Sequence, residues 1–202
     1  NELSGTVPSS LGRLLQVSDM YLEDNALTGT IPESIATMSD LAELRMSQNE
    51  LTGSVPPGLF RLSSLEALYL DQNSLNSTIP ALEGYVKGTP ALRLLRLHSN
   101  RLTGTIAKSL DWFQNLETLS LNGNSLTGSI PSEMGFLRSL KWLYLHKNSL
   151  TGQIPMALAR TPLPLVELTL HHNKLNGTVP EYLGRIETLR KLSLERNEIA
   201  GT

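Results

Sequence analysis

Cysteine is absent from this 202-residue chain, which excludes disulfide bonds and thiol chemistry. No apolar run is long enough to span a bilayer, and no charged and apolar signal-peptide pattern occurs. Neither sign of charge dominates, because 17 basic residues stand against 19 acidic ones, and no basic stripe of the nucleic-acid-binding kind is present. We therefore expect no nucleic-acid partner and no membrane contact by this segment.

Catalytic motifs are missing as well. The sequence contains no phosphate-cradling glycine loop, no nucleophile elbow and no His-Glu-x-x-His zinc motif. We expect that this segment is not an enzyme and uses no cofactor, although a kinase domain can lie elsewhere in the parent protein.

The chain instead has a regular repeat. Nine asparagines, beginning at Asn1, follow one another at spacings of 24, 24, 24, 27, 24, 24, 25 and 24 residues. Each of the last eight ends an LxxLxLxxN pattern, with Val17 opening the first copy, and a period of about 20 to 29 residues with this pattern is typical of leucine-rich repeats. These eight are Asn25, Asn49, Asn73, Asn100, Asn124, Asn148, Asn173 and Asn197. The pattern predicts a single solenoid over residues 1–202, with about eight repeats that each pack only on their neighbours.

Each position of the pattern has a physical role. The leucines at the fourth and sixth places, such as Leu68 and Leu70, lie two apart and point to the same side of a short strand, into the core. The asparagine ends the strand, and its amide can satisfy backbone groups left unpaired in the turn. The sequence therefore predicts about eight strands in one curved parallel sheet, edged by a structural ladder of stacked asparagines.

A second block follows the asparagines, as in LTGTIPESI from Leu27. Its glycine allows a tight turn, its β-branched residue favours a short extended stretch, and its proline stops strand pairing on that side. The leucines that follow, such as Leu59 and Leu62, predict one helical or 3-10 turn on the outer face.

The combined pattern, LxGxIPxxLxxLxxLxxLxLxxN, closely resembles the plant-specific class of leucine-rich repeats over essentially the whole chain. Members of this class include ectodomains of plant receptor-like kinases and receptor-like proteins, secreted inhibitors of cell-wall polygalacturonases, and similar arrays in algae. The resemblance implies an α/β repeat solenoid, a right-handed superhelix with a parallel sheet on its concave face and short helical or 3-10 turns on its convex face. It also implies a second small sheet from the LxGxIP blocks and an extracellular recognition role.

The sequence departs from this pattern in a few places. Three extra residues between Ile79 and Leu92, and one in the segment 159–165, predict bulges on the outer face. Ser77 replaces the usual glycine and Ala107 the usual proline, so we expect an irregular second sheet near them. Neither end of the sequence carries a polar capping unit, and we interpret the segment as an uncapped excerpt of a longer array.

Candidate binding residues occupy the outward positions of the strands. This set contains all four histidines, and its exposed aromatic residues ringed by polar groups are typical of binding patches. The residues that we predict to bind a ligand on the concave face are Tyr21, Tyr69, Leu94, Arg96, His98, Trp142, Tyr144, His146 and His171. A solvated face without a partner is the alternative, because outward positions hold polar residues in any such array.

The histidines raise two further questions. His146 and His171 occupy equivalent places on adjacent strands, so their Cβ atoms should lie ~5 Å apart. Zinc requires three or four ligands and His172 belongs to a different column, so we predict no metal site. The more modest expectation is a pH-sensitive end of the face, because histidine changes its charge between about pH 5 and 8.

Charge is uneven along the chain. Residues 1–75 hold ten acidic and three basic residues, whereas residues 76–202 hold nine acidic and fourteen basic residues. Such a separation of charge along the chain can orient a charged partner. Scattered surface charge without a partner explains the same counts equally well.

Two glycosylation sequons begin at Asn76 and Asn176. Both fall in LxG blocks, at surface turns away from the strand face, and they support secretion together with the family resemblance. Neither is an asparagine of the ladder.

The sequence thus predicts an extracellular or cell-surface recognition module, part of a receptor, that binds a peptide, protein or small ligand, with a co-receptor as a further partner. A soluble secreted binder or enzyme inhibitor is the first alternative, and a structural or adhesive spacer is the second. The sequence beyond this segment would separate them. A transmembrane helix followed by a kinase would indicate the receptor, and a cysteine-paired cap would indicate the secreted binder.

Overall fold

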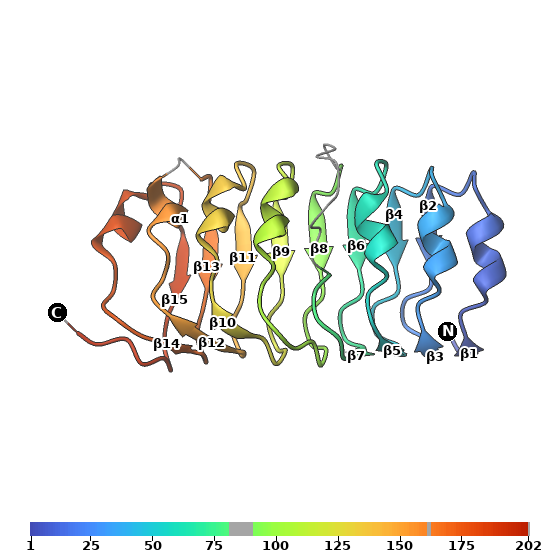
Figure 1. The fold of residues 1–202 in the computed structure, drawn as a ribbon, viewed down its shortest axis with the longest axis horizontal. Coiled ribbons are helices and arrows are strands. Elements are labelled where there is room, and N and C mark those ends of the chain that lie inside the picture. Colours follow the sequence, from blue (N-terminus) through green and yellow to red (C-terminus); the bar gives the residue numbers. More distant parts are fainter. Residues whose placement is uncertain (81–90, 161–162, 202) are drawn as a thin grey trace.

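The computed structural model describes residues 1–80, 91–160 and 163–201. Its elements follow one another in a single row, and the two termini lie at opposite ends of that row (Figure 1). No helix within these residues is long and apolar enough to cross a membrane.

Eight parallel strands form the main sheet, and each strand pairs with the strand of the next repeat in sequence order. In that order they are β2 (Asp19–Tyr21), β4 (Glu43–Arg45), β6 (Ala67–Tyr69), β8 (Leu94–Arg96), β9 (Thr118–Ser120), β11 (Trp142–Tyr144), β13 (Glu167–Thr169) and β15 (Lys191–Ser193). The register is set by the repeat, since the central leucines of neighbouring strands lie opposite each other, as Leu44 does Leu68. The prediction of about eight parallel strands paired in sequence order is confirmed.

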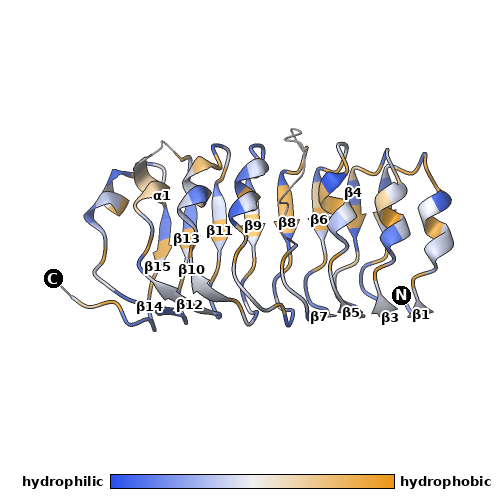
Figure 2. Cartoon of the chain, viewed as in Figure 1, coloured by the Kyte–Doolittle hydropathy of each residue, from blue (hydrophilic) through white to orange (hydrophobic). Residues whose placement is uncertain are grey.

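The hydrophobic core runs along the row behind this sheet. The central leucines of the inner strands are fully buried, and Figure 2 shows hydrophobic residues at the centres of the strands. These leucines are Leu44, Leu68, Leu95, Leu119, Leu143 and Leu168. Leu192 holds the same place in β15, the last strand, and is 41% exposed because a neighbour covers it on one side only. Each repeat therefore needs a repeat on both sides to bury its leucines completely.

The LxGxIP blocks form a second layer of short parallel strands. This layer is divided into a four-stranded and a three-stranded sheet. The first contains β1 (Ser4–Thr6), β3 (Ala26–Thr30), β5 (Glu50–Gly53) and β7 (Ser74–Leu75); the second contains β10 (Thr127–Ser129), β12 (Ser149–Gly152) and β14 (Lys174–Leu175).

The division of the second layer coincides with the atypical residues. In the described part of the chain, only single bridges, Thr78 to Thr103 and Thr105 to Thr127, connect the layer between β7 and β10. Glycines of typical blocks, such as Gly53, have positive φ angles near +75°, which a residue with a side chain adopts less readily. The expected irregularity near Ser77 and Ala107 is thus confirmed.

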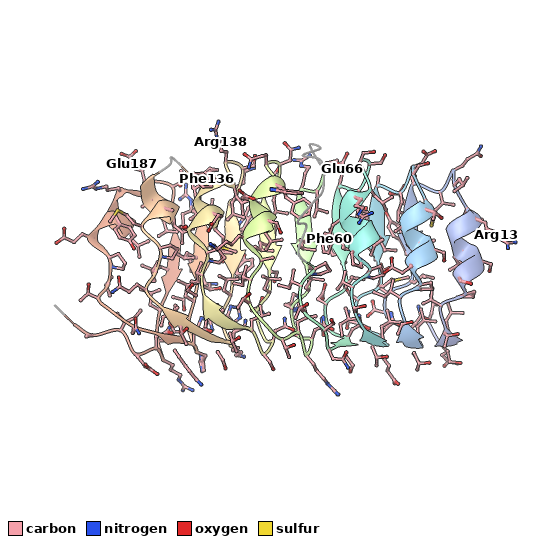
Figure 3. All side chains as sticks on the ribbon, viewed as in Figure 1. Arg13, Phe60, Glu66, Phe136, Arg138 and Glu187 are labelled. Carbon is pink, nitrogen blue, oxygen red and sulfur yellow. The ribbon has the colours of Figure 1, made fainter. Side chains whose placement is uncertain are left out.

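Short helices cover the side of the core opposite the main sheet (Figure 1). They are the 3-10 helices η1 (Ser9–Arg13), η2 (Glu33–Thr37), η3 (Pro57–Arg61), η4 (Lys108–Trp112), η5 (Ser132–Phe136) and η6 (Glu181–Arg185), and the α-helix α1 (Ala157–Arg160). Phe60 on η3 packs inward against Phe113, whereas Phe136 on η5 is 52% exposed (Figure 3). The predicted outer turns are confirmed, and the two predicted bulges lie largely outside the described residues.

Candidate ligand-binding face

The asparagine ladder holds the main sheet in place. Asn100 Oδ1 accepts a hydrogen bond from the Leu75 backbone N–H at 3.0 Å, and its Nδ2 donates to the Leu70 and Leu97 carbonyl oxygens at 3.0 and 3.1 Å. Two of these three partners belong to the preceding repeat. Comparable bonds recur at Asn25, Asn49, Asn73, Asn124, Asn148, Asn173 and Asn197. Because each side chain joins two repeats, the outward side chains stand on a rigid frame.

The residue before each ladder asparagine has a left-handed backbone. Seven of these residues are not glycine, yet their φ angles are 54° to 56°. They are Asp24, Gln48, Gln72, Ser99, Lys147, His172 and Arg196, and the eighth position is Gly123. Left-handed conformations cost non-glycine residues about 1–2 kcal/mol, which the surrounding stack must offset. The sequence carried no signal of this feature, because the residue types at these positions vary.

Tyrosine and arginine alternate at the equivalent outward position of the first four strands. The Arg45 guanidinium lies 4.8 Å from the centre of the Tyr21 ring and 4.9 Å from that of Tyr69, and the Arg96 guanidinium lies 5.3 Å from Tyr69. Cations over aromatic faces attract the ring electrons. We call these four residues the tyrosine–arginine ladder. Three of them were predicted as binding residues, and Arg45 was missed although the alternation along the repeat pointed to it.

Arg45 is also held by carboxylates. Its Nε donates to Glu43 Oε1 at 2.7 Å, and its Nη1 lies 3.9 Å from Glu23 Oε1. The Tyr21 hydroxyl donates to the other oxygen of Glu43 at 3.1 Å. The N-terminal part of the face is therefore a connected polar network.

The tyrosine–arginine ladder borders a shallow polar depression of about 330 Å³, lined by residues of β4, β6 and β8 and of the turns that follow β2, β4, β6 and β8. Ser47 donates to Asp71 at 2.7 Å, and His98 Nε2 lies 3.3 Å from the same carboxylate. Ser47 and Asp71 are buried by these contacts, although the repeat pattern placed them on the outward side. Burial lowers the pKa of His98, and the nearby Asp71 carboxylate offsets this effect only in part.

The C-terminal part of the face contains the predicted aromatic residues of β11. Trp142 is half-buried with the Lys141 ammonium 5.8 Å from its ring centre. The Tyr144 hydroxyl donates to Glu167 at 3.3 Å, and burial, followed by the charge of Glu167, raises the pKa of Tyr144. Neither ring belongs to the hydrophobic core, so both are available to a partner.

Three histidines meet next to these aromatics. The rings of His146 and His171 stack with their centres 4.3 Å apart, and the His172 ring meets His171 edge-on at 5.2 Å. Thr169 and Ser193 hydroxyls lie 2.9 and 3.1 Å from the Nδ1 atoms of His146 and His171. Across the described residues, no group of three or more potential ligands is arranged to hold a metal ion.

The expected titration between pH 5 and 8 is wrong for His146. Burial, together with the neighbouring charges of His171 and Lys147, lowers the pKa of His146 to about 4. Its stacked ring is thus neutral over the range in which a free histidine changes its charge. Proximity to another histidine, which suggested a pH-sensitive site, is part of what suppresses the charge.

The nine predicted binding residues do not form one pocket. One group lies on β2 to β8 and the turns that follow them, and contains Tyr21, Tyr69, Arg96 and His98. The other lies on β11 and β13 and the turns that follow them, and contains Trp142, Tyr144, His146 and His171. Leu94 lies between the groups, next to the small side chains of β9. Tyr21 and Arg96 are exposed, and the others are half-buried. The two groups are therefore successive parts of one extended strand face.

Comparisons with known proteins agree with this geometry. A family model described as Leucine rich repeat matches residues 15–75 and 90–150, and a second model of the same description matches residues 164–186. A search of curated proteins finds no match. Structures of plant receptors are similar over 98% of this chain.

Three of these structures are informative. The Arabidopsis receptor kinase HAESA, in complex with the peptide hormone IDA and the co-receptor SERK1, is 31% identical with a TM-score of 0.92. The PEPR1–AtPEP1 complex is 33% identical with a TM-score of 0.90. The LRR ectodomain of GASSHO1/SCHENGEN3 from Arabidopsis thaliana, in complex with CASPARIAN STRIP INTEGRITY FACTOR 2, is 30% identical with a TM-score of 0.89.

This chain spans 33%, 28% and 23% of the lengths of those three chains, respectively. Its repeats, its sheet and its outer turns nevertheless match the shared fold over nearly its whole length. The chain belongs to the leucine-rich repeat family and folds as an α/β repeat solenoid like the ectodomains of plant receptor kinases.

Proposed function

We propose that this chain is a non-enzymatic recognition module that binds an extended peptide or protein segment across its strand face. The observation that carries the proposal is the row of aromatic and charged side chains on a rigid sheet. The inner strands are hydrogen-bonded on both sides, so a partner must be recognised by outward side chains rather than by strand addition. Tyr69, Trp142 and Tyr144 are the aromatic anchors of this face, and such residues carry much of the energy at interfaces.

The structural neighbours support this proposal. HAESA was solved with a peptide hormone and a co-receptor, and the PEPR1 and GASSHO1/SCHENGEN3 structures are also complexes. We propose by analogy that this chain lies outside the cell, as part of a receptor, and that a co-receptor is a further partner. Asn76 and Asn176 are exposed, on the edge formed by the second layer of strands, and we propose that both carry glycans in the secretory pathway.

The test uses peptides selected on the purified chain from a random display library. Trp142→Ala and Tyr144→Ala should each lower the affinity for the selected peptides about 30-fold, since losing an aromatic anchor costs ~2 kcal/mol or more of binding energy. Phe136→Ala is the matched control, because Phe136 is an exposed aromatic residue on the opposite side of the core. Weaker binding by Phe136→Ala, with unchanged binding by the two strand-face variants, would place recognition on the outer side and refute the proposal.

A further inference from the structure

We infer that the strand face is electrically polar along its length and takes an extended segment of about ten residues with a basic end, an apolar middle and an acidic end. This inference rests on the proposed function, because it specifies the partner of the same face.

The acidic end of the face covers β2, β4 and β6. Its outward positions hold five carboxylates and one guanidinium: Asp19, Glu23, Asp24, Glu43 and Asp71 against Arg45. Asp71 is buried and already bonded to Ser47, but Asp19 and Asp24 are exposed. The excess of negative charge on this part of the face therefore reaches the surface.

Glu23 identifies the kind of group that fits the acidic end. Its Oε2 atom is shielded from solvent and accepts no hydrogen bond from the described residues, while its other oxygen lies 3.9 Å from the Arg45 guanidinium. A shielded carboxylate oxygen without a donor is energetically costly. The Glu23 side chain borders the polar depression and is 30% exposed, so a lysine or arginine of a partner can supply the opposite charge.

The basic end covers β8 to β15. Its outward positions hold four cations and two carboxylates: Arg96, Lys147, Lys191 and Arg196 against Glu167 and Glu195. Lys191 is paired with Glu167 at 3.4 Å. The other three cations are exposed, and in the described structure none of them pairs with a carboxylate. Acidic side chains of a partner are the groups that would neutralise them.

The spacing of the strands decides whether the two ends act separately. Neighbouring strands lie ~4.8 Å apart, so β4 and β13, five steps apart, are separated by about 24 Å. Charges are screened over about 8 Å at physiological ionic strength. Each end therefore attracts its own counter-charge. A uniformly charged partner would be attracted by one end of the face and repelled by the other.

The same spacing gives the length of the partner. The seven steps from β2 to β15 span about 34 Å, which an extended peptide covers with about ten residues. At the start of the basic end, next to the acidic end, the uncharged residues Leu94, Thr118 and Trp142 lie side by side in register on β8, β9 and β11. This uncharged stretch suits apolar side chains in the middle of the segment.

The experiment uses two synthetic ten-residue peptides of identical composition. One has three lysines, four alternating alanines and leucines, and three glutamates in blocks; the other has its lysines and glutamates mixed along the chain. At low salt the block peptide should bind about 10-fold tighter than the mixed peptide, and the difference should vanish at high salt. Equal affinities would overturn the inference, because both peptides bring the same charges.

Crosslinking tests the direction of binding. A photo-crosslinker at the lysine end should label residues of β2 to β6, and one at the glutamate end should label β11 to β15. Glu23→Gln should lower the affinity for the block peptide several-fold, whereas Glu181→Gln on the exposed surface of η6 should leave that affinity unchanged.

The outcomes separate this inference from the function on which it rests. Labelling of the strand face without a preferred direction, or equal effects of Glu23→Gln and Glu181→Gln, overturns the polarity and leaves recognition by this face intact. Labelling confined to the outer helices overturns both.

Discussion

Asn100→Ala tests the physical basis of the stack most directly. Asn100 is 9% exposed and lies at the middle of the ladder. Its side chain satisfies the Leu75 N–H and the Leu70 and Leu97 carbonyl oxygens. An alanine at this position can replace none of these bonds.

The magnitude follows from the number of groups left without a partner. Each buried polar group that loses its hydrogen bond costs ~1–3 kcal/mol. The Leu75 N–H loses the partner that Asn100 provided, whereas the Leu70 carbonyl keeps a bond from Asn73 at 3.2 Å. The Leu97 carbonyl likewise keeps a bond from Asn124 at 3.0 Å. With one buried group left without a partner, we expect Asn100→Ala to lower the free energy of unfolding by ~1–3 kcal/mol.

The assay is urea denaturation followed by circular dichroism, together with hydrogen exchange at the Leu75 amide. The control is Asn176→Ala, since Asn176 is an exposed asparagine outside the ladder. A surface substitution of this kind usually changes stability by less than ~0.5 kcal/mol. If Asn100→Ala costs no more than Asn176→Ala, or if exchange at Leu75 is unchanged, the ladder does not hold the repeats together.

Two further predictions concern backbone strain and pH. Gly104→Ala should lower the free energy of unfolding by ~1–3 kcal/mol, because Gly104 has a φ of +78° and an added Cβ would lie 2.8 Å from the Thr78 methyl. The matched control is Gly184→Ala, in which the added Cβ meets no atom within 4 Å. Equal urea midpoints for the two variants would contradict this prediction. His146 has a pKa of about 4 in the folded chain and ~6.5 when unfolded, so the unfolded chain takes up the proton first and stability should fall as pH drops from about 6.5 to 4. His146→Gln should remove this part of the pH dependence. The prediction is contradicted if the urea midpoints of the variant and of the unchanged chain fall by the same amount between pH 7, 5.5 and 4.

Most of the fold was predictable because every contact in a solenoid is between neighbours. The leucine spacing defines which side of each strand is buried, and the 24-residue period brings equivalent residues into register, as with Leu44 and Leu68. The candidate site was predictable only as a list of outward positions. Their neighbours along the sheet were also known, so the alternation of Tyr21, Arg45, Tyr69 and Arg96 could have been recognised.

Contacts between side chains of different repeats were not predictable in the same way. Ser47, Asp71, Ser120 and Thr169 occupy outward positions, yet all four are buried. Their burial depends on the rotamers of longer neighbours, and a period in the sequence carries no information about rotamers. The neutral state of His146 has the same origin, because it depends on how closely the His171 ring stacks on it.

The sequence by itself determined the architecture of this protein: the parallel sheet, the asparagine ladder, the outer turns and the break in the second layer. These features depend on local chemistry repeated at a constant period, and each repeat meets only the next. Only the tertiary structure decided which outward side chains stay exposed, where Glu23 lacks a donor, and which of the surface charges are paired. Those properties arise when side chains from separate repeats compete for the same space and the same hydrogen bonds.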